Sequence, residues 1–139
     1  MQLQNQARAE PRVYDLSDDS HSARSRNILV LEDDPKFAAL LQATLPEQGY
    51  KVAVVPSGAE GLRLIMDSDF DAILCDMVMP NFPGDMFYLA VQRTKPQLCK
   101  RFIFMTGHEN NPRISSFIQN TQCKILSKPF QLRQLFDAL

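Results

Sequence analysis

From residue 27 onward, the sequence alternates between short apolar runs and longer segments in which apolar residues recur every three or four positions. The apolar runs are ILVL (28–31), YKVAVV (50–55), AILC (72–75), FIFM (102–105) and KILS (124–127). Runs that are apolar throughout are typical of strands buried on both faces, and parallel strands need helical crossovers between them. The pattern therefore predicts an α/β fold, a five-stranded parallel sheet with helices on both faces.

Five helices are predicted to follow the five strands. Ser57 and Glu60 form a capping box, and Asn111 is an N-cap ahead of Pro112 at the first helical position. The residues expected to face the sheet are Phe37, Leu40, Leu41 and Leu45; Leu62, Ile65 and Met66; Met86, Leu89 and Ala90; Ile114, Phe117 and Ile118; and Leu132, Leu135, Phe136 and Leu139.

Length and composition indicate one folded domain. The chain has 139 residues, of which 45% are hydrophobic, which suffices for one compact core. Residues 1–26 are polar and show no sustained periodicity, so we expect a flexible leader or linker there. The folded domain is predicted to span residues 27–139.

Charge and hydropathy exclude several classes of partner. The formal net charge is -1, so the sequence predicts no basic field for nucleic acid or anionic membranes. No apolar run approaches the roughly 20 residues of a membrane helix, and the N-terminus lacks the apolar core of a signal peptide. We therefore expect a cytoplasmic protein. Cys75, Cys99 and Cys123 are odd in number and widely spaced, which favours reduced thiols over a disulfide framework or a zinc site.

Polar side chains follow four of the predicted strands, at the carboxyl edge where doubly wound sheets bind ligands. They are Glu32, Asp33 and Asp34 after the first strand, Asp76 after the third, Thr106 and Gly107 after the fourth, and Lys128 and Pro129 after the fifth. Clustered carboxylates repel unless a cation lies among them, and oxygen ligands suit Mg²⁺. A lysine would pair with the negative charge, and a threonine hydroxyl could hydrogen-bond a phosphoryl oxygen. The set predicts a metal-assisted site that holds a phosphoryl group on a carboxylate.

Four motifs in this order, ILVLEDDP, LCDMVMPNFPG, FMTG and SKPF, resemble the receiver domain of two-component response regulators. The resemblance covers residues 27–139 and implies the flavodoxin-like (βα)5 receiver fold. It also implies that Asp76 is the phosphoacceptor, that Mg²⁺ or Mn²⁺ is the cofactor, and that a histidine kinase or histidine-phosphotransfer protein is the partner. A weak homodimer is a further option. Among receivers, the motifs most resemble those of receivers attached to hybrid sensor kinases. The chain is expected to be either a stand-alone receiver or part of a larger protein.

The same resemblance assigns the metal ligands by position. Asp33 would bind the ion directly and Glu32 through a water molecule. The Asp76 carboxylate and the backbone carbonyl of Val78 would supply the remaining protein ligands.

The resemblance also assigns the residues around the phosphoryl group. Thr106 corresponds to the switch hydroxyl and Lys128 to the lysine that contacts the phosphoryl oxygens, followed by Pro129, whose peptide bond is usually cis in this family. At Ile125 the chain departs from the family, where many receivers have an inward-swinging Tyr or Phe. Isoleucine is stiff at χ1, so we expect the ring relay to be missing. His108 flanks the site and could influence the lifetime of the phosphoryl group, although a solvated loop histidine is the simpler interpretation.

Other residues have a structural interpretation beside the functional one. Asp34 is expected to be a helix N-cap rather than a metal ligand. Met77, Met79 and Phe82 form either a recognition patch or ordinary loop packing. His21, in the predicted leader, has no expected role.

Two other functions are compatible with part of this residue pattern. A haloacid-dehalogenase-like phosphatase also uses a strand-end Asp with Mg²⁺, but it needs a second acid two residues later, where this chain has Val78. A degenerate receiver that acts only as a protein-interaction module is the other alternative. The presence of Asp33, Asp76, Thr106 and Lys128 argues against it.

Overall fold

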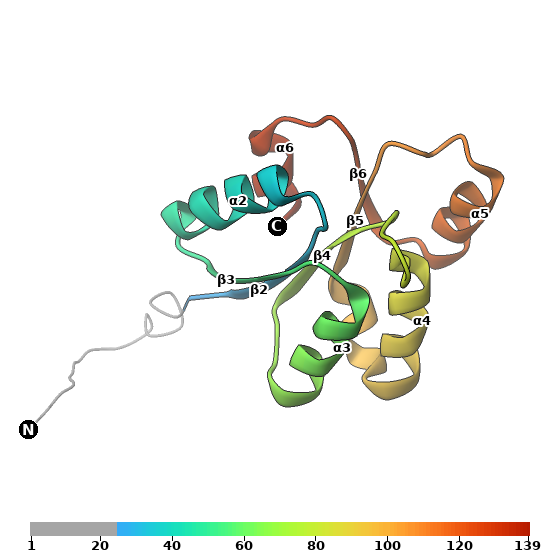
Figure 1. Cartoon of the computed structure of the whole chain (residues 1–139), viewed down its shortest axis with the longest axis horizontal. Coiled ribbons are helices and arrows are strands. Elements are labelled where there is room, and N and C mark those ends of the chain that lie inside the picture. The colour runs from blue at the N-terminus through green and yellow to red at the C-terminus, as the bar shows by residue number, and fades with distance from the viewer. Residues whose placement is uncertain (1–24) are drawn as a thin grey trace, which may run out of the picture.

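Five parallel strands form one sheet in the computed structural model, which describes residues 25–139 (Figure 1). The strands are β2 (Asn27–Leu31), β3 (Lys51–Val55), β4 (Ala72–Asp76), β5 (Phe102–Thr106) and β6 (Lys124–Ser127). Their order across the sheet is β3-β2-β4-β5-β6, and every neighbouring pair is parallel. The predicted α/β sheet is confirmed. The predicted leader, apart from residues 25 and 26, and His21 lie outside the described residues.

Helices cover both faces of the sheet. The α-helices are α2 (Pro35–Thr44), α3 (Gly58–Asp67), α4 (Gly84–Thr94), α5 (Pro112–Thr121) and α6 (Leu132–Ala138), and two 3-10 helices are η1 (Pro46–Gln48) and η2 (Pro96–Arg101). Helices α2 and α6 pack on one face, and α3, α4 and α5 pack on the other (Figure 1). Within residues 25–139, every helix is too short or too polar to cross a bilayer.

Alternate residues of each central strand face opposite cores. In β4, Ile73 and Cys75 point toward α3, α4 and α5, whereas Ala72 and Leu74 point toward α2 and α6. This follows from the two-residue period of a strand. Because β4 and β5 are buried along their whole length, the carboxyl ends of both strands are held rigidly.

The predicted helix starts are confirmed by their capping contacts. Asp34, Ser57 and Asn111 each accept a hydrogen bond from a backbone N–H two or three residues later, at 3.1, 3.4 and 2.9 Å. Asp34 therefore has the structural role that the sequence favoured.

The predicted buried face of α4 is wrong. Met86 and Leu89 are 50% and 48% exposed, whereas Phe87, Tyr88 and Val91 lie in the core. The rings of Phe87 and Tyr88 pack against a third ring on β5, with centroids 5.7 and 5.0 Å from it. Aromatic side chains bury more apolar area than methionine or leucine, so the helix is rotated to place them inward.

Two further residues predicted to be buried are exposed, Leu40 by 43% and Met66 by 55%. Helix α3 approaches the sheet closely through Gly61, where an added Cβ would lie 2.9 Å from the Leu31 side chain. The close approach through Gly61 and the burial of Ile65 turn Met66 outward. In α2 only Leu41 is fully buried, so the buried stripe is narrower than the sequence pattern suggested.

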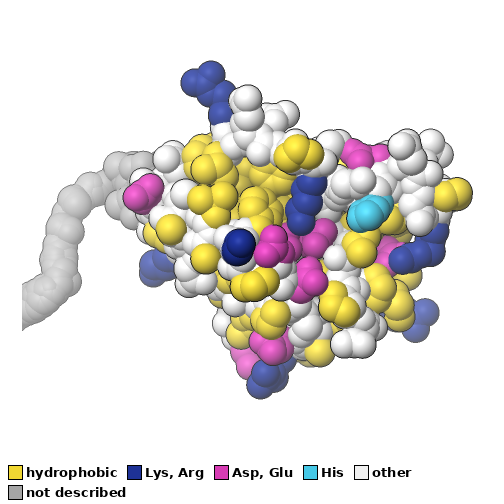
Figure 2. Space-filling view, turned by 45° about the horizontal axis from the view of Figure 1, so that its top comes forward, with side chains coloured by type: hydrophobic (Ala, Val, Ile, Leu, Met, Phe, Trp, Pro, Cys, Tyr) yellow, Lys and Arg dark blue, Asp and Glu magenta, His cyan; other side chains and the backbone are white. Residues whose placement is uncertain are grey.

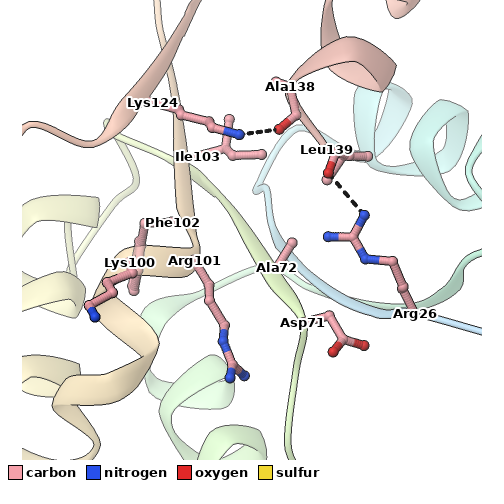
Figure 3. A pocket seen from close by; sticks show the side chains of 10 residues that line it. All are labelled: Arg26, Asp71, Ala72, Lys100, Arg101, Phe102, Ile103, Lys124, Ala138 and Leu139. Carbon is pink, nitrogen blue, oxygen red and sulfur yellow. Dashed lines mark hydrogen bonds between the residues drawn. The ribbon is translucent and has the colours of Figure 1, made fainter. Parts of the chain in front are cut away.

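Positive side chains satisfy backbone carbonyls at the amino edge of the sheet, around a cavity of about 130 Å³ (Figure 3). Lys124 donates to the carbonyl of Ala138 at 2.7 Å, and Arg26 donates to that of Leu139 at 2.9 Å. Carbonyls at a helix C-terminus lack intrahelical partners and have partial negative charge, so both contacts stabilise the end of α6.

Candidate functional site

The predicted site residues converge at the carboxyl edge of the sheet. Asp76 and Thr106 are the last residues of β4 and β5, Glu32 follows β2, and Lys128 follows β6. Lys128 Nζ lies 2.9 Å from Glu32 Oε1 and 3.5 Å from Asp76 Oδ2. Residues separated by up to 96 positions in the chain thus form one charged cluster.

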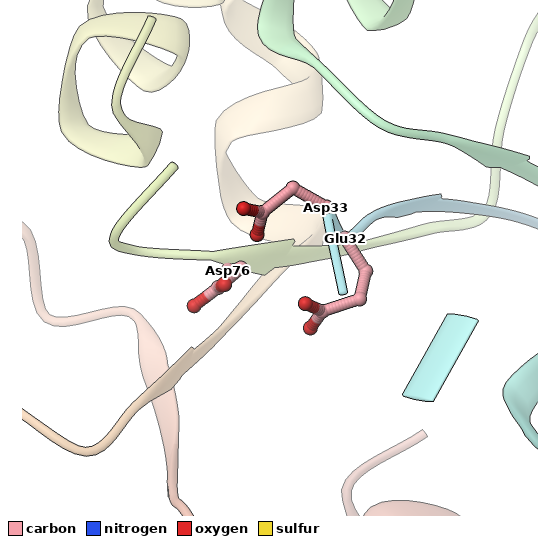
Figure 4. A group of neighbouring side chains, drawn as sticks. All are labelled: Glu32, Asp33 and Asp76. Carbon is pink, nitrogen blue, oxygen red and sulfur yellow. The ribbon is translucent and has the colours of Figure 1, made fainter. Parts of the chain in front are cut away.

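Three carboxylates lie close enough together to bind one cation (Figure 4). Glu32, Asp33 and Asp76 each offer an oxygen atom, and these atoms all lie within 4.8 Å of one another. Glu32 and Asp76 are buried, being 2% and 6% exposed, whereas Asp33 is exposed. Mg²⁺ binds a few carboxylate oxygens and retains several waters, so a cluster with one open side fits this ion. Val78 donates its N–H to Asp76 Oδ1 at 3.4 Å, and the role of its carbonyl stays a prediction.

The backbone after β4 folds back tightly against the phosphoacceptor candidate. The N–H of Met77 donates to the carbonyl of Met105 at 2.9 Å, and the N–H of Gly84 donates to the carbonyl of Met77, also at 2.9 Å. A Cβ on Gly84 would lie 2.4 Å from the backbone oxygen of Asp76. Only glycine permits this approach, which holds Asp76 in place.

Burial and charge shift the protonation of this cluster. Burial, together with the charge of Glu32, raises the pKa of Asp76 to about 6, against the opposing effect of Lys128. Burial alone would lower the pKa of Lys128, but its hydrogen bond to Glu32 and the two nearby negative charges raise that pKa overall. The second Glu32 oxygen accepts from the N–H of Asp34 at 3.0 Å, which fixes its orientation.

Thr106 and His108 are joined at the end of β5. Thr106 is 1% exposed, and its hydroxyl accepts a hydrogen bond from the backbone N–H of His108 at 2.9 Å. The His108 side chain is exposed. A movement of the Thr106 hydroxyl would therefore displace the loop that leads into α5 through this hydrogen bond.

The loop candidates are mostly packing residues. Met77 and Met79 are 1% and 3% exposed, so they belong to the core rather than to a recognition patch. Phe82 is half-buried, and its ring lies edge-on to Phe87 at 6.5 Å. Ile125 is half-buried beside the core that faces α5. The peptide bond between Lys128 and Pro129 is cis, as the resemblance implied.

Two contacts that flank the site have no signature in the sequence. Arg113 in the first turn of α5 pairs with Asp85 in the first turn of α4. The Ser127 hydroxyl donates to the Glu109 carboxylate, which lowers the pKa of Glu109. These partners are far apart in the chain, so only the packed helices and strands reveal them.

A cavity of about 330 Å³ beside Lys128 was likewise not predicted from the sequence. Its lining includes Phe37, Pro129 and Phe130, and the rings of Phe37 and Phe130 meet edge-on at 5.7 Å. Lys128 Nζ lies 5.1 Å from the centroid of the Phe37 ring. Figure 2 shows acidic side chains gathered on this face with apolar side chains beside them. A macromolecule approaching the acidic cluster would meet an apolar surface.

Comparison with known proteins adds a family match to this geometry. The model described as the response regulator receiver domain matches residues 28–139. Transcriptional regulatory protein GlrR of Escherichia coli (strain K12) is 29% identical over 118 residues, which are 85% of this chain and 26% of GlrR. Sensor kinase CckA of Brucella abortus (strain 2308) is 28% identical over 131 residues, 93% of this chain and 13% of CckA. The chain thus spans only a small part of either relative.

The fold is shared with a solved structure. The receiver domain of sensor histidine kinase PA1611 from Pseudomonas aeruginosa PAO1 aligns with a TM-score of 0.73 at 24% identity, over 82% of this chain and 93% of that chain. That domain was solved with a magnesium ion coordinated in its active site cleft.

Replacing Asp33 should weaken Mg²⁺ binding far more than replacing its neighbour. Asp33→Ala removes one of the three carboxylates of the cluster, so we expect the dissociation constant to rise by about tenfold or more. Asp34→Ala changes the net charge equally but removes only a helix cap, which should cost about 1 kcal/mol of stability. Isothermal titration with MgCl₂ and chemical denaturation of both variants would measure these effects. Loss of binding in Asp34→Ala with retention in Asp33→Ala would contradict the ligand assignment.

Proposed function

The chain belongs to the response regulator receiver family, since the family model matches residues 28–139, and from this premise we propose that it accepts a phosphoryl group from a phosphohistidine onto Asp76. The reaction depends on Mg²⁺ or Mn²⁺ and belongs to two-component signalling or a phosphorelay. The observation that supports this proposal most strongly is the position of Lys128 Nζ, 2.9 Å from Glu32 and 3.5 Å from Asp76. A buried carboxylate held beside a cation suits a nucleophile that must accept an anionic group.

The chemistry follows from the charges at the edge of the sheet. One Asp76 carboxylate oxygen attacks phosphorus, the P–N bond to the donor imidazole breaks, and its electron pair stays on the imidazole. With a pKa of about 6, Asp76 is largely ionised at neutral pH and can act as the nucleophile. Lys128 would stabilise negative charge on the transferred oxygens. A metal ion held by Glu32, Asp33 and Asp76 would neutralise further charge. The PA1611 domain, which has the same fold, was solved with a magnesium ion in its active site cleft.

The phosphoryl donor must reach Asp76 from the solvent side of the carboxyl edge. The apolar cavity lined by Phe37, Pro129 and Phe130 lies next to Lys128, and Leu40 on the same helix as Phe37 is 43% exposed. We propose that a histidine kinase or histidine-phosphotransfer protein docks there, so that its imidazole comes within reach of Asp76. The compartment would be the cytoplasm, where such kinases use ATP.

The structure favours a phosphorylatable receiver over the two alternatives. Asp33, Asp76, Thr106 and Lys128 are not only present but gathered at one edge, which a degenerate receiver does not require. Val78, at the position of the second acid of haloacid-dehalogenase-like phosphatases, is 44% exposed and has no acid group. We also propose that the domain catalyses its own dephosphorylation, and the weak homodimer stays a prediction.

The roles proposed for Thr106 and Ile125 together determine how far we expect a phosphoryl signal to spread. A phosphoryl oxygen on Asp76 could draw the Thr106 hydroxyl, and the loop would follow through the hydrogen bond from His108. Ile125 lies opposite Phe104 in the sheet and has no ring to swing inward when Thr106 moves. We therefore propose that the domain stores or relays a phosphoryl group rather than producing a large conformational output.

Acetyl phosphate with Mg²⁺ should modify Asp76 alone. Intact-mass and peptide mass spectrometry should show one phosphoryl group on the wild type and on Asp34→Asn, a matched control that removes a neighbouring charge. Asp76→Asn should incorporate none. Equal incorporation by Asp76→Asn and wild type would contradict the assignment, and Mg²⁺-independent incorporation would contradict the role of the metal.

Beryllofluoride, which mimics the phosphoryl group, should shift backbone resonances near Thr106 and His108 more than those of α5 and α6. Ile125→Phe restores a ring at the departing position and should enlarge the response of α5. Chemical-shift mapping of both proteins would measure the difference. Large cooperative changes across residues 111–139 of the wild type, or dimerisation driven by beryllofluoride, would contradict the limited response.

A further inference from the structure

Two of the three cysteines converge on one tyrosine hydroxyl, away from the carboxyl edge. Tyr88 on α4 lines one surface cavity together with Cys99 and Cys123, and its interactions with both thiols contribute to the raised pKa of its hydroxyl. Both thiols are half-buried, whereas Cys75 is buried within β4.

The backbone brings the two cysteines together from neighbouring segments. Ile103 lies opposite Lys124 in the parallel pairing of β5 with β6, so Cys123 lies beside Phe102. Cys99 is in η2, about one 3-10 turn before Phe102. Cys99 and Cys123 therefore both lie close to Phe102, on two neighbouring segments of the backbone.

A surface cavity of about 350 Å³ gives small reagents access to both sulfurs. Tyr88, Cys99 and Cys123 line it together with Lys100 and Lys124. Burial raises the pKa of the Cys99 thiol despite its hydrogen bond with Tyr88, so its reduced form gains little from ionisation. A pair whose thiolates are weakly stabilised favours the disulfide at equilibrium.

We propose that Cys99 and Cys123 are a redox pair that hydrogen peroxide converts into an intramolecular disulfide. One thiolate attacks a peroxide oxygen, the O–O bond breaks, and a sulfenic acid and one water form. The second thiol attacks the sulfenic sulfur, the S–O bond breaks and a second water leaves. The two cysteines lose two electrons and two protons, and the peroxide is reduced to two waters. A thiol reductant reverses the step.

The disulfide would fasten one end of α5. Cys123 follows the C-terminus of α5, and η2, with Cys99, follows α4 directly. The other end of α5 is already tied to α4 by the ion pair between Arg113 and Asp85. Oxidation would therefore link both ends of α5 to the α4 segment and restrain the helix that follows Thr106. This chemistry uses no residue of the carboxyl-edge site, so it does not rest on phosphorylation of Asp76.

Peptide mass spectrometry of the reduced full chain after treatment with hydrogen peroxide tests the proposal. We expect the monomer to lose two hydrogen atoms and a cross-linked peptide pair to contain Cys99 and Cys123, with Cys75 alkylated only after unfolding. Dithiothreitol should restore the original mass. Oxidation should also raise the melting temperature, because a cross-link limits the unfolded chain.

Conservative variants separate this pair from general thiol oxidation. Cys75→Ser should form the disulfide as the wild type does, whereas Cys99→Ser and Cys123→Ser should each abolish it. Circular dichroism would establish that each variant is folded. Sulfinic or sulfonic acid on separate cysteines, or a disulfide found only between two molecules, would overturn the proposal.

Discussion

The site depends on the repulsion between the buried carboxylates of Glu32 and Asp76, which the positive charge of Lys128 partly offsets. Glu32 and Asp76 are 2% and 6% exposed, and Lys128 Nζ contacts both. The raised pKa of Asp76 means that ionising its carboxyl in the free protein costs stability as the pH rises from about 4 through about 6. Relief of this repulsion therefore contributes favourably to the binding free energy of a cation or a partner.

The fold is arranged to hold this cluster together. Strands β4 and β5 are buried along their whole length, so Asp76 and Thr106 have little freedom at the strand ends. Gly84 allows the loop after β4 to turn back against Asp76, and the N–H of Asp34 fixes Glu32. At the opposite edge, Lys124 and Arg26 donate to the carbonyls at the end of α6, whereas three carboxylates gather around one lysine at the acidic edge.

Local patterns were sufficient for the sheet, the helix caps and the strand-end residues, because each depends on spacing within one segment. The orientation of α4 was not predictable in this way. Met86 and Leu89 match a helical stripe as well as Phe87 and Tyr88 do, and only contact with rings on β5 decides between them. The pairing of Arg113 with Asp85 and the cavity that Cys99 and Cys123 line together likewise require the packed structure.

Asp76 is a buried carboxylate, and we expect a bound cation to stabilise its ionised form. A ¹³C NMR titration of the aspartate carboxyl carbons would measure this effect. Without divalent metal, the carboxyl of Asp76, assigned by comparison with Asp76→Asn, should titrate with a pKa of about 6. Saturating Mg²⁺ should lower that pKa by about one unit or more, because the bound cation favours the ionised form. A pKa near 4, the ordinary value for aspartate, that is unchanged by Mg²⁺ would contradict the account.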